Sequence, residues 1–280
     1  MLFTYSEWEK FCRKLSENNI QSITAASILN LALQGTPISS RYVNIKHDVE
    51  SVPSKALALA RIEAKYGHCA TYYVQAYLMT DSNKDVFKAI QSLGHEVTYH
   101  HDVMDCAKGD IQLAMTIYKE NVAKFEQLGF PVVTVCQHGN PSSKYENRDF
   151  FRSDFIQKQF ASQSDIMVDF MIKAKSQYTY ISDVGMKFKI VTDPVNSDKV
   201  KEEEKYIVLG DAMQVIEHII THPDKSYIVS AHPHRYNKNR LSAALRKMLF
   251  QMLKCVAKVL FKLPGLKNFV FRFKTITKHL

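Results

Sequence analysis

The clearest pattern in the sequence is an alternation of short apolar runs with longer amphipathic stretches. The apolar runs are rich in β-branched and aromatic residues, which is typical of strands, and they cover 41–47, 70–75, 95–100, 131–136, 178–182, 206–209 and 226–231. Helical periodicity lies between them, over 54–66, 85–93, 111–128 and 211–220. Strands that alternate with helices predict parallel strands joined by right-handed crossovers. We therefore expect an α/β fold, a distorted or incomplete (β/α) barrel of about seven parallel strands.

Two further segments flank this barrel region. Residues 1–40 predict two helices, and residues 236–280 predict a tail that contains an amphipathic helix over 241–262. The polar segment 142–177 predicts an insertion with a helix inside it. The sequence thus divides into an N-terminal helical segment, the barrel at 41–235, and a basic amphipathic C-terminal tail.

Polar side chains follow most of the predicted strands. They are His47 and Asp48, Gln75, His100 and His101, Gln137 and His138, Asp183, and His232 with His234 close behind. The C-terminal ends of parallel barrel strands point to one face, where active sites lie. A lone histidine after a strand is more often a capped or solvated loop residue, but four histidine-bearing strand ends together favour a site. Imidazole and carboxylate groups are typical ligands of a divalent metal such as zinc.

The net charge of +9 is divided unevenly along the chain. From Lys225 onward there are 13 Lys or Arg and no Asp or Glu, so the preceding residues hold 24 of the 37 basic side chains (37 − 13) and all 28 acidic ones. A basic helix with aromatic residues predicts contact between residues 241–280 and an anionic membrane surface. Packing of the helix on the barrel is the alternative. Nucleic acid ranks lower as a partner, because no nucleic-acid-binding module is recognisable.

The cysteines and the N-terminus indicate a compartment. The five cysteines are scattered, without a CxxC spacing, which fits reduced thiols better than a disulfide framework. The first residues lack the basic and apolar regions of a signal peptide. No apolar run reaches the roughly 18 residues that a membrane span needs. We expect a cytoplasmic protein, peripheral on the inner face of the membrane.

The order of these motifs resembles that of the polysaccharide deacetylases, carbohydrate esterase family 4, over roughly residues 41–235. The family's TFDDG motif is matched by IKHDV, its ATFFV-like strand by ATYYV, and its GHEIGNH motif by GHEVTYH, at 45–49, 70–74 and 94–100. Weaker counterparts are CQHGNP, YISD and YIVSAH, at 136–141, 180–183 and 227–232. The first motif, of the form HDV(D/E), is typical of a divergent branch.

The resemblance implies roles for several of these residues. Asp48 and His100 match metal ligands of the family, and His232 matches its general acid. The family's base aspartate is replaced by His47, which can serve as the base because histidine titrates near neutral pH. We expect Asp183 to orient His232, as a carboxylate does for a catalytic imidazole.

The third metal ligand departs from the family pattern. The family's second metal histidine falls on Met104, and the arginine of the third motif is absent. His138, on the next strand end, is the first choice for this ligand. His101 is the second, although adjacent strand residues point to opposite faces, and Glu50 is the third.

The function that the resemblance implies is a metal-dependent hydrolase with a divalent ion, zinc, as cofactor. It would remove acetyl groups from N-acetylated sugars in surface polysaccharide synthesis, with Gln75, Asn140 and Arg148 binding the glycan. Arg148 serves equally well as part of a cap for the insertion helix. The alternative is a catalytically inactive deacetylase-like domain that binds glycan or a partner enzyme. The third metal ligand distinguishes these two functions.

Overall fold

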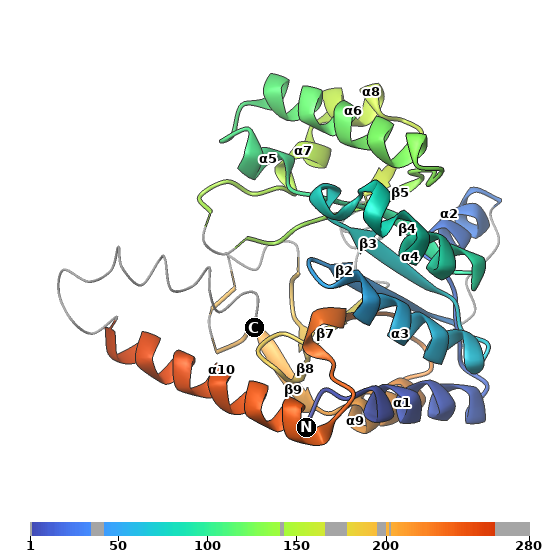
Figure 1. Ribbon diagram of the computed structural model, residues 1–280, viewed down its shortest axis with the longest axis vertical. Coiled ribbons are helices and arrows are strands. Elements are labelled where there is room, and N and C mark those ends of the chain that lie inside the picture. Colours follow the sequence, from blue (N-terminus) through green and yellow to red (C-terminus); the bar gives the residue numbers. More distant parts are fainter. Residues whose placement is uncertain are drawn as a thin grey trace.

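The computed structural model describes residues 2–34, 42–140, 143–165, 178–194, 200–201 and 203–260. Its strands are β1 Gln21–Ser22, β2 Tyr42–Val49, β3 Ala70–Val74, β4 Glu96–His101, β5 Thr134–Gln137, β6 Ser164–Asp165, β7 Tyr178–Ser182, β8 Phe188–Val191, β9 Tyr206–Gly210 and β10 Ser226–Ala231. They form one sheet in the order β6-β5-β4-β3-β2-β10-β7-β8-β9, and β1 pairs with the start of β2 (Figure 1).

The first seven strands in this order, which begin with β6 and end with β7, run parallel. Strands β8 and β9 continue the sheet in antiparallel pairing. The predicted α/β class with about seven parallel strands is therefore confirmed. One of the seven predicted parallel strands is wrong: β9 was expected to be parallel, but it forms an antiparallel hairpin with β8. The short strand β6 takes the seventh parallel place. Among the described strands no pairing joins β6 to β9, so the observed sheet is open.

Most of the helices lie where the sequence predicted them, and the short helix over 103–106 is an addition. They are α1 Tyr5–Glu17, α2 Ala25–Leu33, α3 Pro53–Lys65, α4 Asp81–Ser92, α5 Val103–Cys106, α6 Ile111–Gln127, α7 Asp149–Arg152, α8 Asp154–Gln159, α9 Ala212–Thr221 and α10 Arg240–Leu260, with 3₁₀ turns η1 Ala76–Leu78 and η3 Pro233–Arg235. Figure 1 shows α6, α7 and α8 beyond β5, and α1 beside α9 near the opposite edge; α1 also packs on α3, and α3 on α4. The predicted insertion contains α7, α8 and β6, and its residues 166–177 lie outside the described ranges.

The core lies between the sheet and α1, α3, α4 and α6. On α1 the side chains of Trp8, Phe11 and Leu15 share one face and are fully buried, as expected for apolar residues at helical spacing. Strand β2, in the centre of the sheet, is buried along nearly its whole length. Val43, Ile45, His47 and Val49 alternate with Asn44, Lys46 and Asp48, so the two faces of β2 carry different chemistry.

The C-terminal helix α10 extends away from the sheet (Figure 1). Within the described part of the chain, no helix is long and apolar enough to cross a membrane.

Candidate active site

A cavity of about 220 Å³ lies at the C-terminal ends of the central strands. Its ionisable lining is Lys46, Asp48, Glu50, His100 and His232, and its apolar side is formed by Tyr180, Val184, Val191, Pro194 and Tyr206. A cavity with convergent polar groups on one wall and apolar groups on the other is typical of a small-molecule site. It is smaller than pockets of roughly 300–1,000 Å³ that hold drug-sized ligands, and this favours a small ligand or one part of a larger ligand.

The innermost charged pair of this cavity is Lys46 with Asp48. Both side chains project from the same face of β2, since they are two residues apart, and Lys46 Nζ lies 2.7 Å from Asp48 Oδ2. Burial alone would raise the pKa of Asp48, but the Lys46 ammonium holds that pKa well below its usual range. Asp48 is therefore a carboxylate at neutral pH, and it faces the cavity.

Glu50, His100 and His138 form the best donor cluster in the described ranges. Glu50 Oε1 lies 3.2 Å from His138 Nε2 and 3.9 Å from His100 Nε2, and the three ligand atoms lie within 4.8 Å of one another. Burial would raise the pKa of Glu50, but the hydrogen bond from His138 and the nearby imidazoles lower it instead. Burial lowers the pKa of His100 to about 3, so that imidazole is neutral near pH 7.

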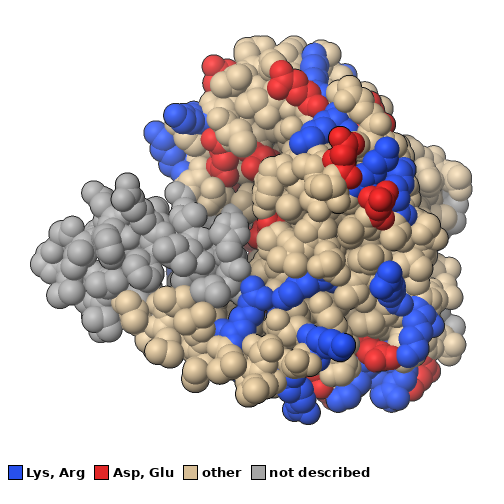
Figure 2. All heavy atoms as spheres, in the orientation of Figure 1, with Lys and Arg blue, Asp and Glu red and all other residues tan. Residues whose placement is uncertain are grey.

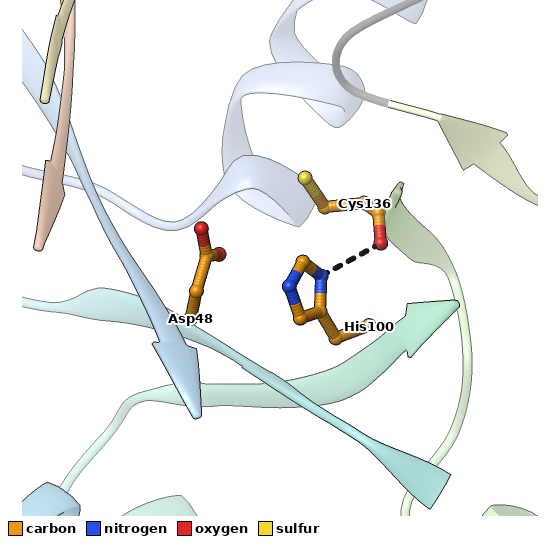
Figure 3. Close-up of side chains that lie close together, drawn as sticks. All are labelled: Asp48, His100 and Cys136. Atoms are coloured by element: carbon orange, nitrogen blue, oxygen red, sulfur yellow. Dashed lines mark hydrogen bonds between the residues drawn. The ribbon is translucent and has the colours of Figure 1, made fainter. Parts of the chain in front are cut away.

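The tautomer of His100 suits a metal ligand. Its Nδ1–H donates to the carbonyl oxygen of Cys136 at 3.0 Å, so the Nε2 lone pair points into the site. Figure 3 shows Asp48, His100 and Cys136 turned toward one another from β2, β4 and β5. In a tetrahedral zinc site, bonds of about 2.0–2.2 Å place ligand atoms roughly 3.3–3.6 Å apart. The distances from Glu50 Oε1, 3.2 Å to His138 and 3.9 Å to His100, lie on either side of this range.

A second donor cluster consists of Asp48, His100 and Cys136. It fits a metal less well, because Asp48 already pairs with Lys46. Burial also raises the pKa of the Cys136 thiol, and a metal ligand must be a thiolate. The cluster around Glu50 is thus the better candidate metal centre. It includes His138, the first choice for the third ligand, and Glu50, the third choice.

An oriented histidine stands on the other side of the cavity. His232 Nδ1 donates to Asp183 Oδ1 at 2.7 Å, and the backbone N–H of His232 donates to Asp183 Oδ2 at 3.0 Å. The guanidinium of Arg235 donates to both the carboxylate and the backbone carbonyl oxygen of Asp183. Burial would raise the pKa of Asp183, but Arg235 and His232 lower it. With Nδ1 held in this way, His232 Nε2 faces the cavity, 3.8 Å from Asp48 Oδ2.

His47, predicted as the base, does not face the cavity. It is fully buried on the helix-covered side of β2, where its ring stacks on Tyr72 with centroids 4.5 Å apart. Its Nε2 donates to Glu63 Oε1 at 2.6 Å. Because side chains alternate along a strand, the cavity position goes to Asp48 and the core position to His47. The prediction that His47 acts as the base is therefore wrong.

His101 lies on the helix side of β4, as the alternation of strand residues requires. Its Nε2 is 3.0 Å from Asp165 Oδ2, and Tyr118, Phe150 and Phe151 surround its ring. This second choice for the metal ligand is thus part of the core, on the opposite face from His100.

The three residues predicted to bind glycan are absent from the cavity lining. Gln75 is buried just after β3, and Asn140 donates to Asp105 Oδ2 at 2.9 Å. Arg148 is also buried, with Nε 3.6 Å from Glu146 Oε2. Their role in binding glycan stays a prediction.

Two residues of the site were missed in the sequence. Lys46 could have been found, because a lysine inside a buried strand at spacing i, i+2 from Asp48 predicts a paired charge on the same face. Arg235 carried no comparable signal. Asn147 holds the loop that bears His138, through a 2.8 Å hydrogen bond to the carbonyl oxygen of that residue.

No protein-family model matches the sequence, and no curated protein matches it in sequence. Several solved structures are similar in fold. A CE4 esterase of Streptococcus mutans is 13% identical, with a TM-score of 0.43, over 90% of this chain and 88% of that one. The Streptococcus pyogenes deacetylase PplD, solved with acetate, is 13% identical, with a TM-score of 0.43, over 50% of this chain and 67% of that one.

The peptidoglycan deacetylase PdaC of Bacillus subtilis is 12% identical, with a TM-score of 0.35, over 76% of this chain and 96% of that one. The similar structures are thus CE4 proteins and deacetylases, the group that the sequence motifs resemble. Likeness at this level assigns no activity, so the function must be judged from the geometry of the site.

Proposed function

We propose that this protein is a metal-dependent deacetylase of N-acetylated sugars in surface polysaccharide synthesis. The observation that carries the proposal is the convergence of Glu50, His100 and His138 at a cavity that Glu50, His100 and His232 line, with Asp183 bound to His232. A carboxylate with two imidazoles is a common ligand set for catalytic zinc. The ion, when bound there, would supply Lewis-acid polarisation of the acyl carbonyl.

The remaining groups divide the proton transfers between them. Asp48 is ionised and faces the cavity, so it can accept a proton from the attacking water. His232 can carry a proton on Nε2 to the departing amine, because Asp183 fixes its Nδ1 as a donor. Lys46 holds the Asp48 carboxylate in place. The base is thus Asp48, in the role that the sequence assigned to His47.

The location that we propose is cytoplasmic. All five cysteines are free, and two of them, Cys12 and Cys136, are buried. Free thiols in this number suit a reducing compartment. A protein in that compartment would act on glycan precursors before export.

Metal content and acetate release test the proposal together. Wild-type protein should bind one divalent ion and release acetate from N-acetylglucosamine oligomers. Glu50→Ala and His138→Ala should lose both the ion and the activity. His101→Ala is the matched control, because it removes a buried histidine from the opposite face of the sheet, and its folded fraction should keep the ion. Equal metal content in wild type, Glu50→Ala and His138→Ala would contradict the proposal.

A second function is favoured by the Lys46–Asp48 ion pair. The Lys46 ammonium already neutralises the Asp48 carboxylate in the cavity. A domain that binds glycan without hydrolysing it could use this ion pair to form hydrogen bonds with the glycan. Binding of N-acetylated glycan with unchanged affinity after metal chelation, and without acetate release, would support this function.

A further inference from the structure

Among the described residues, the C-terminal helix α10 carries an exposed apolar stripe. Its members are Leu241, Leu245, Met248, Leu249, Met252 and Val256, and their exposed fractions range from 43% to 73%. Residues at this spacing fall on one face of a helix, within an arc of roughly 100°. Exposed leucines and methionines in one contiguous stripe indicate an interaction surface.

The opposite face of α10 is the one that packs on the body. Ala243 is only 2% exposed, and Phe250 packs against the main core. Arg246 donates to the carbonyl oxygen of His234, in the loop that follows β10. These contacts fix the rotation of the helix, so the stripe points outward. Packing on the barrel, the alternative that the sequence left open for this helix, therefore applies to the opposite face.

Charge identifies the kind of partner. The sequence from Lys225 onward has 13 basic and no acidic residues, and Lys238 and Arg240, at the start of the helix, are exposed. Figure 2 shows no acidic side chain over the described part of α10, whereas the rest of this face mixes both signs. A partner must therefore offer both an apolar phase and negative charge.

From this combination we infer that α10 docks the protein on an anionic membrane surface, with the stripe lying in the interface. An amphipathic helix with basic residues binds in this way through buried apolar area and attraction to anionic lipid headgroups. A second copy of the chain fits less well, because it would bring two basic tails together. Nucleic acid offers no apolar phase for the stripe. The inference does not depend on the proposed deacetylase activity.

The test is co-sedimentation of the full-length protein with vesicles of phosphatidylcholine, with or without phosphatidylglycerol. Binding should require phosphatidylglycerol and should fall steeply with added salt, which screens charges beyond a Debye length of about 8–10 Å. The double variant Leu245→Gln/Met252→Gln should bind at least about tenfold more weakly, since burial of one such side chain alone is worth roughly that factor.

The matched control is Leu33→Gln/Leu113→Gln, which removes two exposed apolar residues from α2 and α6 (77% and 47% exposed, against 54% and 57% for Leu245 and Met252). It should bind as the wild type does, and both variants should keep the wild-type circular dichroism and melting temperature. Equal binding by the stripe variant and this control would overturn the inference. Vesicle binding without anionic lipid would also overturn it, and so would a wild type that does not bind. A dimer in solution that only the stripe variant dissociates would show that the stripe contacts a second copy of the chain instead.

Discussion

Strand β2 buries ionisable side chains on both of its faces, and the two faces differ in how those groups are satisfied. On the helix-covered face, Glu63 of α3 accepts hydrogen bonds from Trp8 Nε1 at 2.9 Å, Tyr72 Oη at 2.7 Å and His47 Nε2 at 2.6 Å. On the other face, the Glu50 carboxylate contacts histidine side chains beside a cavity. One carboxylate is enclosed by donors of the core, and the other is open to a ligand.

The difference shows that a shifted pKa does not by itself mark a site. Burial would raise the pKa of both Glu63 and Glu50, and neighbouring donors lower both instead. Structural networks and active sites therefore give the same direction of shift. Access to the cavity separates them: Glu63 is fully buried, whereas Glu50 lines the cavity.

The largest expected effect is on the enclosed face. Glu63→Ala should lower the free energy of unfolding by about 3–5 kcal/mol, because it leaves Trp8, Tyr72 and His47 without their buried acceptor. Glu50→Ala should change it by less than about 1 kcal/mol, since active-site groups are seldom optimised for stability. Urea unfolding of both variants measures the contrast. Glu63→Gln, which keeps one acceptor oxygen, should lie between wild type and Glu63→Ala, and equal losses for Glu63→Ala and Glu50→Ala would refute the contrast.

The same strand shows how far the sequence could predict the site. Apolar runs that finish in polar residues were enough to predict the strand itself. They also predicted that one end of the sheet brings together Asp48, His100, His138 and His232. The face of His47 was mispredicted, because its place in a motif was weighed above the alternation of side chains.

Other features depend on contacts between distant segments. The hairpin of β8 and β9 was missed because Phe188–Val191 is a short run with little pattern of its own. The Arg235–Asp183 contact depends on how η3 turns after β10, and periodicity along a strand carries no information about that turn.

The second prediction compares two histidine–aspartate pairs. Asp183→Asn should lower kcat about 100-fold, because His232 Nδ1 loses the carboxylate that fixes its orientation and tautomer. Asp165→Asn disturbs the pair with His101 on the core face. It should lower stability while the folded fraction keeps its kcat. Acetate release per folded protein distinguishes the two, and a kcat for Asp183→Asn equal to that for Asp165→Asn would show that the cavity pair is structural too.

The smallest expected effect concerns Lys46, which is 2% exposed and pairs with Asp48. Lys46→Met removes a positive charge from the cavity, so a divalent ion should bind about tenfold more tightly, because the repulsion between two like charges is gone. The pKa of Asp48 should rise at the same time, because the ammonium that lowers it is gone and burial remains. The acid limb of activity should therefore move to higher pH. Zinc titration calorimetry at neutral pH and a pH profile measure both effects. Lys46→Arg keeps the charge and should leave both near the wild-type values. Weaker zinc binding by Lys46→Met would show that the lysine organises the ligands instead of opposing the ion.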